Sequence, residues 1–211
     1  MKRFDLSLYL VLDPDLCAAI GMIETARLAV AGGATMVQLR DKHAGTPRMI
    51  ETGRALKQAL AGTGALLIVN DDVEAAVAIG ADGLHIGQED MDARTARAMI
   101  GPEMILGLSV ETEALAAAVD PGLVDYTGVG PVFATPTKAD HKQPIGFDGL
   151  ARLVKASPVP SVAIGGLKAE HVAEVFTAGA RGIAVVSAIC GTRDPEAATR
   201  RIAAEIRKVR P

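Results

Sequence analysis

The sequence has 211 residues, 49% of them hydrophobic and 22% charged, a composition typical of one soluble globular domain. The 22 Lys and Arg residues are balanced by 25 Asp and Glu, and only 3% of residues are aromatic, so we expect no nucleic-acid partner. No apolar run could span a bilayer, and Asp5, Asp13 and Asp15 interrupt any signal-peptide core, so we expect a cytoplasmic protein without membrane contact.

Short apolar runs recur along the chain and are mostly continuous rather than alternating. This pattern indicates strands buried on both faces, as in a parallel sheet covered by helices. The predicted strands cover residues 8–12, 36–39, 66–69, 84–86, 104–108, 126–129, 162–164 and 183–186. Stretches with helical spacing lie between them, among them residues 20–30, 48–60, 93–100, 113–119, 147–155, 169–176 and 194–209.

The order of these elements predicts the fold class. A β-α unit repeated eight times in 211 residues corresponds to a (β/α)₈ TIM barrel, in a single domain covering residues 1–211. An open doubly wound sheet is the alternative, but the first β-α turn lacks the Gly-x-Gly-x-x-Gly fingerprint. Asp92, Thr112 and Asp194 are positioned as helix N-caps.

Polar residues follow the carboxyl end of nearly every predicted strand, and in a barrel these ends converge on one face. After the second strand, Gln38, Arg40 and Lys42 share one face of an extended chain, because side chains alternate. A guanidinium and an ammonium together suit phosphate oxygens. A solvated basic loop is the alternative, which we disfavour because Gln38 and Arg40 would be costly near a buried strand end.

Carboxylates end the next two strands and indicate a metal site. Asp71 follows Asn70 after the third strand, and Asp90 follows the fourth. Two carboxylates with room for water and phosphate oxygens form a typical Mg²⁺ site. Helix capping is the alternative for Asp71, and it is the role that we assign to Asp72.

The last three strands indicate a second anion-binding region. In residues 131–146 the hydroxyls of Thr135 and Thr137 and the ammonium of Lys138 suit anionic groups, although a plain loop is the alternative. Gly165-Gly166 and Ser187 follow strands seven and eight, where barrels often bind phosphate through backbone N–H groups, although two tight turns are the alternative. His85, inside the fourth strand, is expected to be a hydrogen-bonded core histidine.

The sequence therefore predicts two phosphate subsites, one suited to a diphosphate with Mg²⁺ and one to a monophosphate. We identify no convincing acid–base pair or nucleophile between them in the sequence. Such an enzyme would ionise a good leaving group through electrostatics and positioning.

The chain resembles the thiamine-phosphate synthase family over residues 8–189. The motifs that carry the resemblance are VQLRDK at 37–42, VNDD at 69–72, HIGQED at 85–90, GLS at 107–109, the segment from GP at 130–131 to TPTK at 135–138, IGG at 164–166 and VS at 186–187. Together and in this order they are highly specific.

The resemblance implies a (β/α)₈ enzyme that joins 4-amino-2-methyl-5-hydroxymethylpyrimidine diphosphate to a thiazole phosphate. Its products would be thiamine phosphate and pyrophosphate, with CO₂ as well when the thiazole is carboxylated. By the same resemblance, the pyrimidine diphosphate would be held by Gln38, Leu39, Arg40, Asp41, Lys42, Asn70, Ser109 and Lys138. Of these, Arg40, Lys42, Ser109 and Lys138 would be catalytic.

The resemblance also implies one Mg²⁺ per subunit, held by Asp71 and Asp90. The thiazole phosphate would be held by Thr135, Pro136, Thr137, Gly166, Val186 and Ser187. One departure is Ala139, where family members often carry a second lysine after Lys138.

Three other functions compete with coupling. A thiazole tautomerase shares the barrel and the thiazole phosphate but needs no Mg²⁺–diphosphate site. A non-catalytic sensor of phosphorylated metabolites would bind without turnover, and a sugar-phosphate isomerase would need an acid–base pair. The expected partners are small phosphorylated substrates, and pairing with a copy of the same chain is an open possibility.

Overall fold

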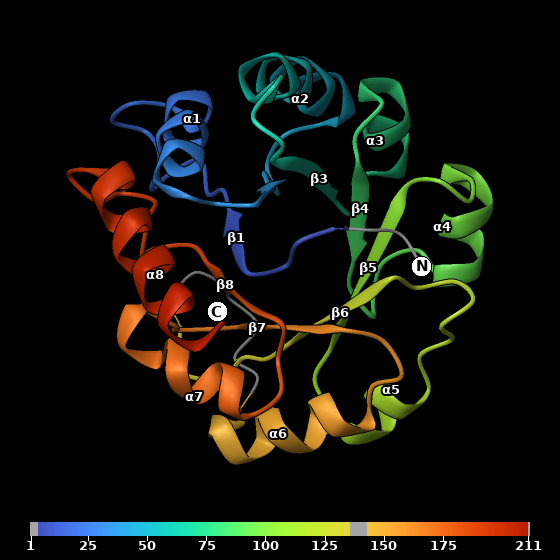
Figure 1. The fold of residues 1–211 in the computed structure, drawn as a ribbon. Coiled ribbons are helices and arrows are strands. Elements are labelled where there is room, and N and C mark those ends of the chain that lie inside the picture. The colour runs from blue at the N-terminus through green and yellow to red at the C-terminus, as the bar shows by residue number, and fades with distance from the viewer. Residues whose placement is uncertain (1–3, 136–142, 211) are drawn as a thin grey trace.

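A computed structural model describes residues 4–135 and 143–210 and contains a closed barrel of eight parallel strands. Each strand pairs with its neighbours in chain order, and β1 also pairs with β8, which closes the ring. The helices surround the strands on the outside (Figure 1). The predicted (β/α)₈ single-domain fold is confirmed, and the open doubly wound sheet is excluded because it would leave two unpaired edges.

The strands and helices alternate as the apolar runs predict, with ends that differ by one or two residues. The strands are β1 Leu8–Val11, β2 Met36–Leu39, β3 Leu66–Asn70, β4 Gly83–Ile86, β5 Ile105–Val110, β6 Tyr126–Val129, β7 Ser161–Ile164 and β8 Gly182–Val185. The helices are α1 Met22–Gly32, α2 Thr46–Leu60, α3 Val73–Ile79, α4 Ala93–Ile100, α5 Glu113–Ala117, α6 Gly146–Ala156, α7 Val172–Thr177 and α8 Pro195–Val209. The predicted helix 169–176 is divided, because a 3₁₀ turn, Ala169–His171, precedes α7. None of the helices within the described ranges is both long and apolar enough to cross a membrane.

Side-chain caps begin four of the helices, as the sequence predicts. Each cap oxygen accepts a hydrogen bond from a backbone N–H in the first turn, which would otherwise lack a partner. The caps are Asp72 for α3, Asp92 for α4, Thr112 for α5 and Asp194 for α8.

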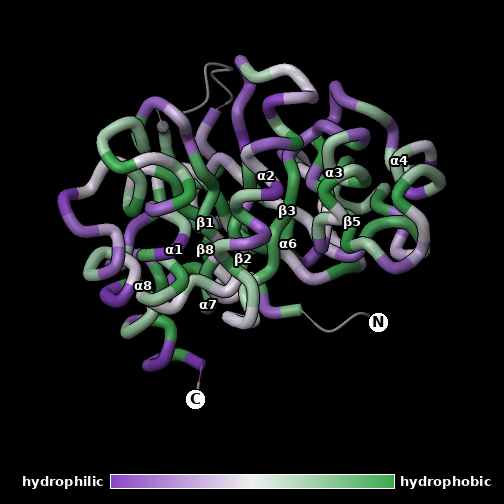
Figure 2. The backbone as a smooth tube through the Cα atoms, turned by 90° about the horizontal axis from the view of Figure 1, so that it is seen from above, coloured by the Kyte–Doolittle hydropathy of each residue, from purple (hydrophilic) through white to green (hydrophobic). Residues whose placement is uncertain are grey.

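Two apolar clusters hold the barrel together. The larger lies between strands and helices, and the smaller fills the barrel interior with residues from seven of the strands: Tyr9, Met36, Ile68, Ile105, Tyr126, Val162 and Ala184, together with Leu6. The fourth strand contributes Gly83 at this level, where a Cβ atom would lie 2.6 Å from Ile68 Cδ1. Hydrophobic colour is concentrated along the strands in Figure 2, and hydrophilic colour along the outer turns. The barrel interior is thus filled by side chains toward the amino ends of the strands, and a cavity inside the barrel must lie at the carboxyl ends of the strands.

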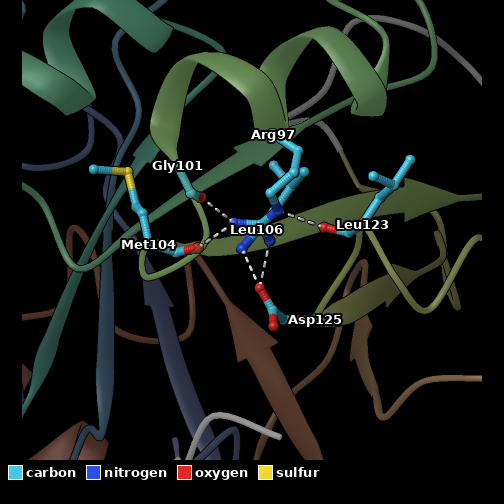
Figure 3. A network of polar contacts seen from close by, with 6 residues as sticks. All are labelled: Arg97, Gly101, Met104, Leu106, Leu123 and Asp125. Atoms are coloured by element: carbon cyan, nitrogen blue, oxygen red, sulfur yellow. Dashed lines mark hydrogen bonds and ion pairs between the residues drawn. The ribbon is translucent and has the colours of Figure 1, made fainter.

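Arg97 on α4 ties the amino ends of β5 and β6 together (Figure 3). Its Nη2 donates to Asp125 Oδ2 at 2.7 Å, and the same oxygen accepts the Leu106 N–H at 2.9 Å. The guanidinium also donates to the backbone carbonyls of Gly101, Met104 and Leu123. The two charged side chains are only 14% and 19% exposed, so this pair is largely shielded from solvent.

Arg97→Leu should therefore lower the free energy of unfolding by about 3 kcal/mol, because the shielded Asp125 carboxylate loses its guanidinium. Urea denaturation of the variant measures this loss. The matched control is Arg48→Leu, since Arg48 pairs with Glu51 on α2 with both side chains about two-thirds exposed. The control should lose less than about 1 kcal/mol. Equal losses in the two variants would contradict a stabilising role for the Arg97–Asp125 pair.

Candidate functional site

A cavity opens at the carboxyl ends of the strands and is lined by residues from all eight of them. Its volume is about 1160 Å³, including the part open to solvent. Most lining positions alternate along their strands, because successive strand side chains point to opposite faces, although Val185 on β8 also lines the cavity. They include Tyr9 and Val11; Gln38, Arg40 and Lys42; Asn70; His85 and Gly87; Ser109 and Glu111; Gly128 and Gly130; Val162, Ile164 and Gly166; Ala184 and Val186.

The second strand supplies the cations, as its alternation predicts. Gln38, Arg40 and Lys42 all line the cavity. Gln38 is buried and Arg40 half-buried, whereas Lys42 is exposed and places Nζ 3.7 Å from Asp71 Oδ2. Lys42 thus lies at the mouth of the cavity, where a charged ligand would enter, and Arg40 lies further inside.

Leu39 and Asp41, which the resemblance places among the residues that hold the pyrimidine diphosphate, do not line the cavity with their side chains. Leu39 is fully buried in the apolar layer between barrel and helices. The Asp41 carboxylate accepts the backbone N–H groups of His43 and Ala44, at 3.0 and 3.1 Å, and so shapes the turn before α2. Both residues alternate with Gln38, Arg40 and Lys42, so their side chains point away from the cavity.

Asp71 and Asp90 face each other across the mouth of the cavity. Strict alternation along β3 would point the Asp71 side chain away from the cavity, because Asn70 points into it. Asp71 nevertheless lines the cavity, since its φ of 61° lies in the left-handed region and the chain leaves the strand direction there. Burial, followed by the hydrogen bond and charge of the neighbouring Asp90 carboxyl, raises the pKa of Asp71 to about 6. Asp90 Oδ2 also accepts the Gly87 N–H at 2.7 Å.

This donor set fits a hard divalent cation. Within residues 4–135 and 143–210 no cluster of three or more His, Cys, Asp or Glu side chains could hold a metal ion. Mg²⁺ nevertheless binds in proteins through one or two carboxylates, with substrate phosphates and water completing its coordination. Two acidic groups held close together, one with a raised pKa, are at lower energy when a cation lies between them.

The fourth and fifth strands place polar groups deeper in the cavity. His85 Nε2 is 3.0 Å from Ser109 Oγ, and Asn70 lines the wall beside them. The sequence predicts that His85 is a hydrogen-bonded core residue, and both of its ring nitrogens are hydrogen-bonded. Tyr9 and Glu111 also line the cavity and were not expected there. Their inward parity is the signal that could have identified them.

The opposite wall is made of glycine turns. Gly165 and Gly166 have φ of 106° and 64°, and a Cβ at Gly166 would lie 2.8 Å from Phe133 Cβ and 2.9 Å from Ala134 O. The Val186 carbonyl accepts the N–H groups of Ile189 and Cys190, so a tight helical turn begins directly after β8. Such turns direct backbone N–H groups at an anion.

The remaining predicted residues on this side divide into two groups. Thr135 and Ser187 line the cavity with Gly166 and Val186, and Ser187 is exposed at its rim. Pro136, Thr137 and Lys138 lie outside the described residues, as does Ala139. The structure therefore brings the cationic, acidic and glycine-rich groups around one cavity, and this arrangement can hold two anionic ligands side by side.

Comparisons with known proteins agree with one another. The family model described as thiamine monophosphate synthase matches residues 8–189. The thiamine-phosphate synthase of Xanthobacter autotrophicus is 52% identical over 205 residues, which cover 97% of each chain. That of Moorella thermoacetica is 44% identical and covers 100% of this chain and 99% of its own length. The solved structure of thiamine phosphate pyrophosphorylase from Pyrococcus furiosus superposes with a TM-score of 0.88 at 37% identity, covering 98% of both chains.

Proposed function

The chain belongs to the thiamine monophosphate synthase family, and from this premise we propose that its cavity joins a pyrimidine diphosphate to a thiazole phosphate. The chain is accordingly an enzyme, a transferase that forms thiamine phosphate and releases pyrophosphate. One observation carries the proposal: cations and paired carboxylates at one wall share a single cavity with glycine turns at the other. A binding site for one monophosphate would not need both walls.

The substrate at the cationic wall is 4-amino-2-methyl-5-hydroxymethylpyrimidine diphosphate in this proposal. Arg40 and Lys42 bind the diphosphate oxygens and neutralise the charge that grows on departing pyrophosphate. Gln38, Asn70 and Ser109 lie deeper and hold the pyrimidine ring. Lys138, beyond the described residues, would add a third cation from the loop after β6.

Asp71 and Asp90 would hold one Mg²⁺ per chain. Bound there, the ion would neutralise part of the charge on the diphosphate. The support for this assignment is the direct interaction of the two carboxyl groups and the position of Lys42 beside them.

The thiazole phosphate would bind at the glycine wall. Gly166, Val186 and Ser187 supply backbone N–H groups there, and Thr135 supplies a hydroxyl. Pro136 and Thr137 would complete this subsite from outside the described residues.

The chemistry then needs no general base. The C–O bond to the diphosphate breaks with its electron pair leaving on pyrophosphate, while the pyrimidine amino group donates electrons to the resulting carbocation. The thiazole nitrogen uses its lone pair to form the new C–N bond. When the thiazole is carboxylated, CO₂ leaves as well, the electron pair of the broken C–C bond stays on the ring carbon, and that carbon takes a proton from water. The enzyme contributes orientation, charge neutralisation and exclusion of water.

The test is pyrophosphate release from the purified protein with each substrate alone and with both, with and without Mg²⁺. We expect release only when both substrates and Mg²⁺ are present. Isomerisation of the thiazole without pyrophosphate would identify a tautomerase instead, and binding without turnover would identify a sensor.

Ser187→Trp should lower kcat/KM for the thiazole phosphate about 100-fold, because the indole fills the rim of that subsite and displaces the phosphate. Steady-state kinetics at saturating pyrimidine diphosphate measure the change. Ser187→Ala is the matched control, since it keeps the backbone N–H groups and should cost only a few-fold. An unchanged KM in the Trp variant would show that the subsite lies elsewhere.

A further inference from the structure

Five polar side chains form a continuous hydrogen-bond network across the barrel interior, at the floor of the cavity. Gln38 Nε2 donates to Tyr9 Oη at 2.8 Å, and Tyr9 Oη lies 3.0 Å from Tyr126 Oη. Tyr126 Oη lies 2.9 Å from His85 Nδ1, and His85 Nε2 lies 3.0 Å from Ser109 Oγ. The five residues come from β2, β1, β6, β4 and β5 in that order. We refer to them as the interior network.

Two glycines on the barrel strands leave space for this network. A Cβ atom at Gly107 on β5 would overlap both the Tyr126 hydroxyl and His85 Nδ1. A Cβ at Gly128 on β6 would lie 3.1 Å from His85 Cε1. Glycine at both positions therefore allows Tyr126 and His85 to meet, and the sequence alone gives no sign of this requirement.

Burial keeps both phenols protonated. Tyr9 and Tyr126 are 1% and 0% exposed, and burial raises the pKa of each well above the ordinary value for a phenol. Each hydroxyl thus has one proton to donate. A buried donor without an acceptor is unfavourable, so the network is most stable when every proton is used.

The number of available protons then determines which atom donates and which accepts in each hydrogen bond of the network. Tyr9 Oη accepts the Gln38 amide, so the Tyr9 proton is used within the network only if it goes to Tyr126. The Tyr126 proton must then go to His85 Nδ1, which leaves the imidazole proton on Nε2, where it is donated to Ser109 Oγ. The Ser109 hydroxyl proton stays available to the cavity, and the Gln38 amide directs its oxygen away from Tyr9.

We propose that Tyr9 and Tyr126 are positioning residues that make Gln38 an acceptor and Ser109 a donor for the ligand at the same time. The donors and acceptors exchange roles only if the Gln38 amide group rotates by about 180° and His85 changes tautomer at the same time. An acceptor paired with a donor complements an aminopyrimidine, whose amino group donates and whose ring nitrogen accepts. The inference rests on the proposed function and identifies the part of the substrate that the floor of the cavity recognises.

The first arm of the test needs no substrate. ¹⁵N–¹H NMR of the labelled protein at about pH 8 reports the tautomer of each neutral histidine, and His85→Gln assigns the His85 signals. We expect the proton on His85 Nε2, and a shift of the tautomer equilibrium in Tyr126→Phe, which keeps the ring but removes the donor. His171 is an internal control, because its Nδ1 accepts the Lys168 N–H at 3.1 Å and should not respond. A proton on His85 Nδ1, or no response in Tyr126→Phe, would overturn the proposal.

The second arm is a double-mutant cycle between Tyr126→Phe and Ser109→Ala. Tyr126→Phe should lower kcat/KM for the pyrimidine diphosphate about tenfold and leave KM for the thiazole phosphate unchanged. Combined with Ser109→Ala it should cost clearly less than the sum of the two single losses, because Tyr126 acts in part through Ser109. Fully additive losses would indicate a merely structural tyrosine and refute the proposal. A wild-type protein that shows the expected tautomer but no coupling would refute the proposed function and leave the direction of the network established.

Discussion

Replacing Asp71 by asparagine should lower the rate of pyrophosphate release about 100- to 1,000-fold, with the fold intact. The substitution keeps the shape of the side chain but removes the charge that faces Asp90 and Lys42 at the mouth of the cavity. A cation bound there would lose half of its carboxylate ligands. Initial rates over a range of Mg²⁺ concentrations measure the effect, and the Mg²⁺ concentration for half-maximal rate should rise.

The neighbouring residue is the control for this prediction. Asp72 caps α3 by accepting the Ala75 N–H at 2.8 Å, and asparagine is an equally good cap. Asp72→Asn should therefore leave both the rate and its Mg²⁺ dependence near those of the wild type. Near-normal activity of Asp71→Asn at limiting Mg²⁺ would show that Asp71 is not a metal ligand.

Replacing Arg40 by alanine should lower kcat/KM for the pyrimidine diphosphate about 100- to 1,000-fold. Arg40 is a half-buried cation between Gln38 at the floor of the cavity and Lys42 at its mouth. In the proposed mechanism its loss removes a bidentate donor to phosphate oxygens that gain charge as the C–O bond breaks, so kcat should fall as well as affinity.

Two comparisons make the Arg40 result specific. Arg40→Lys keeps the charge but not the planar pair of donors, and it should recover only part of the lost rate. KM for the thiazole phosphate should stay unchanged in both variants, because we propose that this substrate binds at the opposite wall. A loss confined to the thiazole phosphate would reverse our assignment of the two walls.

Local sequence signals predict much of this fold because they depend on neighbouring residues only. Thr112 and Asp194 cap their helices as predicted, since a cap contacts N–H groups two or three residues away. Hydrophobicity was less reliable at strand ends. The predicted fifth strand stops at residue 108, whereas β5 continues to Val110 because Ser109 pairs with Gly128 on β6. Ser109 is polar because it faces the cavity, so an apolar run cannot reveal that it is in a strand.

In the candidate site, too, local sequence predicts some features and the tertiary structure decides others. Alternation correctly places Gln38, Arg40 and Lys42 on the face that lines the cavity. The same rule places Leu39 on the opposite, buried face, although Leu39 belongs to the same sequence motif. Asp71 departs from the parity of its strand because its backbone adopts φ of 61°, which alternation cannot predict. The motifs therefore indicate which segments lie near the cavity, and backbone geometry decides which of their side chains enter it.

The sequence by itself determined the order of strands and helices, the helix caps and the period-two placement of polar groups, because each depends on chain geometry over a few residues. Only the tertiary structure decided that Tyr9 meets Tyr126, 117 positions away, and that Gly107 leaves space for Tyr126 to reach His85. Those contacts form across the interior of a closed barrel. Closure depends on the pairing of β1 with β8, which no local segment of the chain encodes.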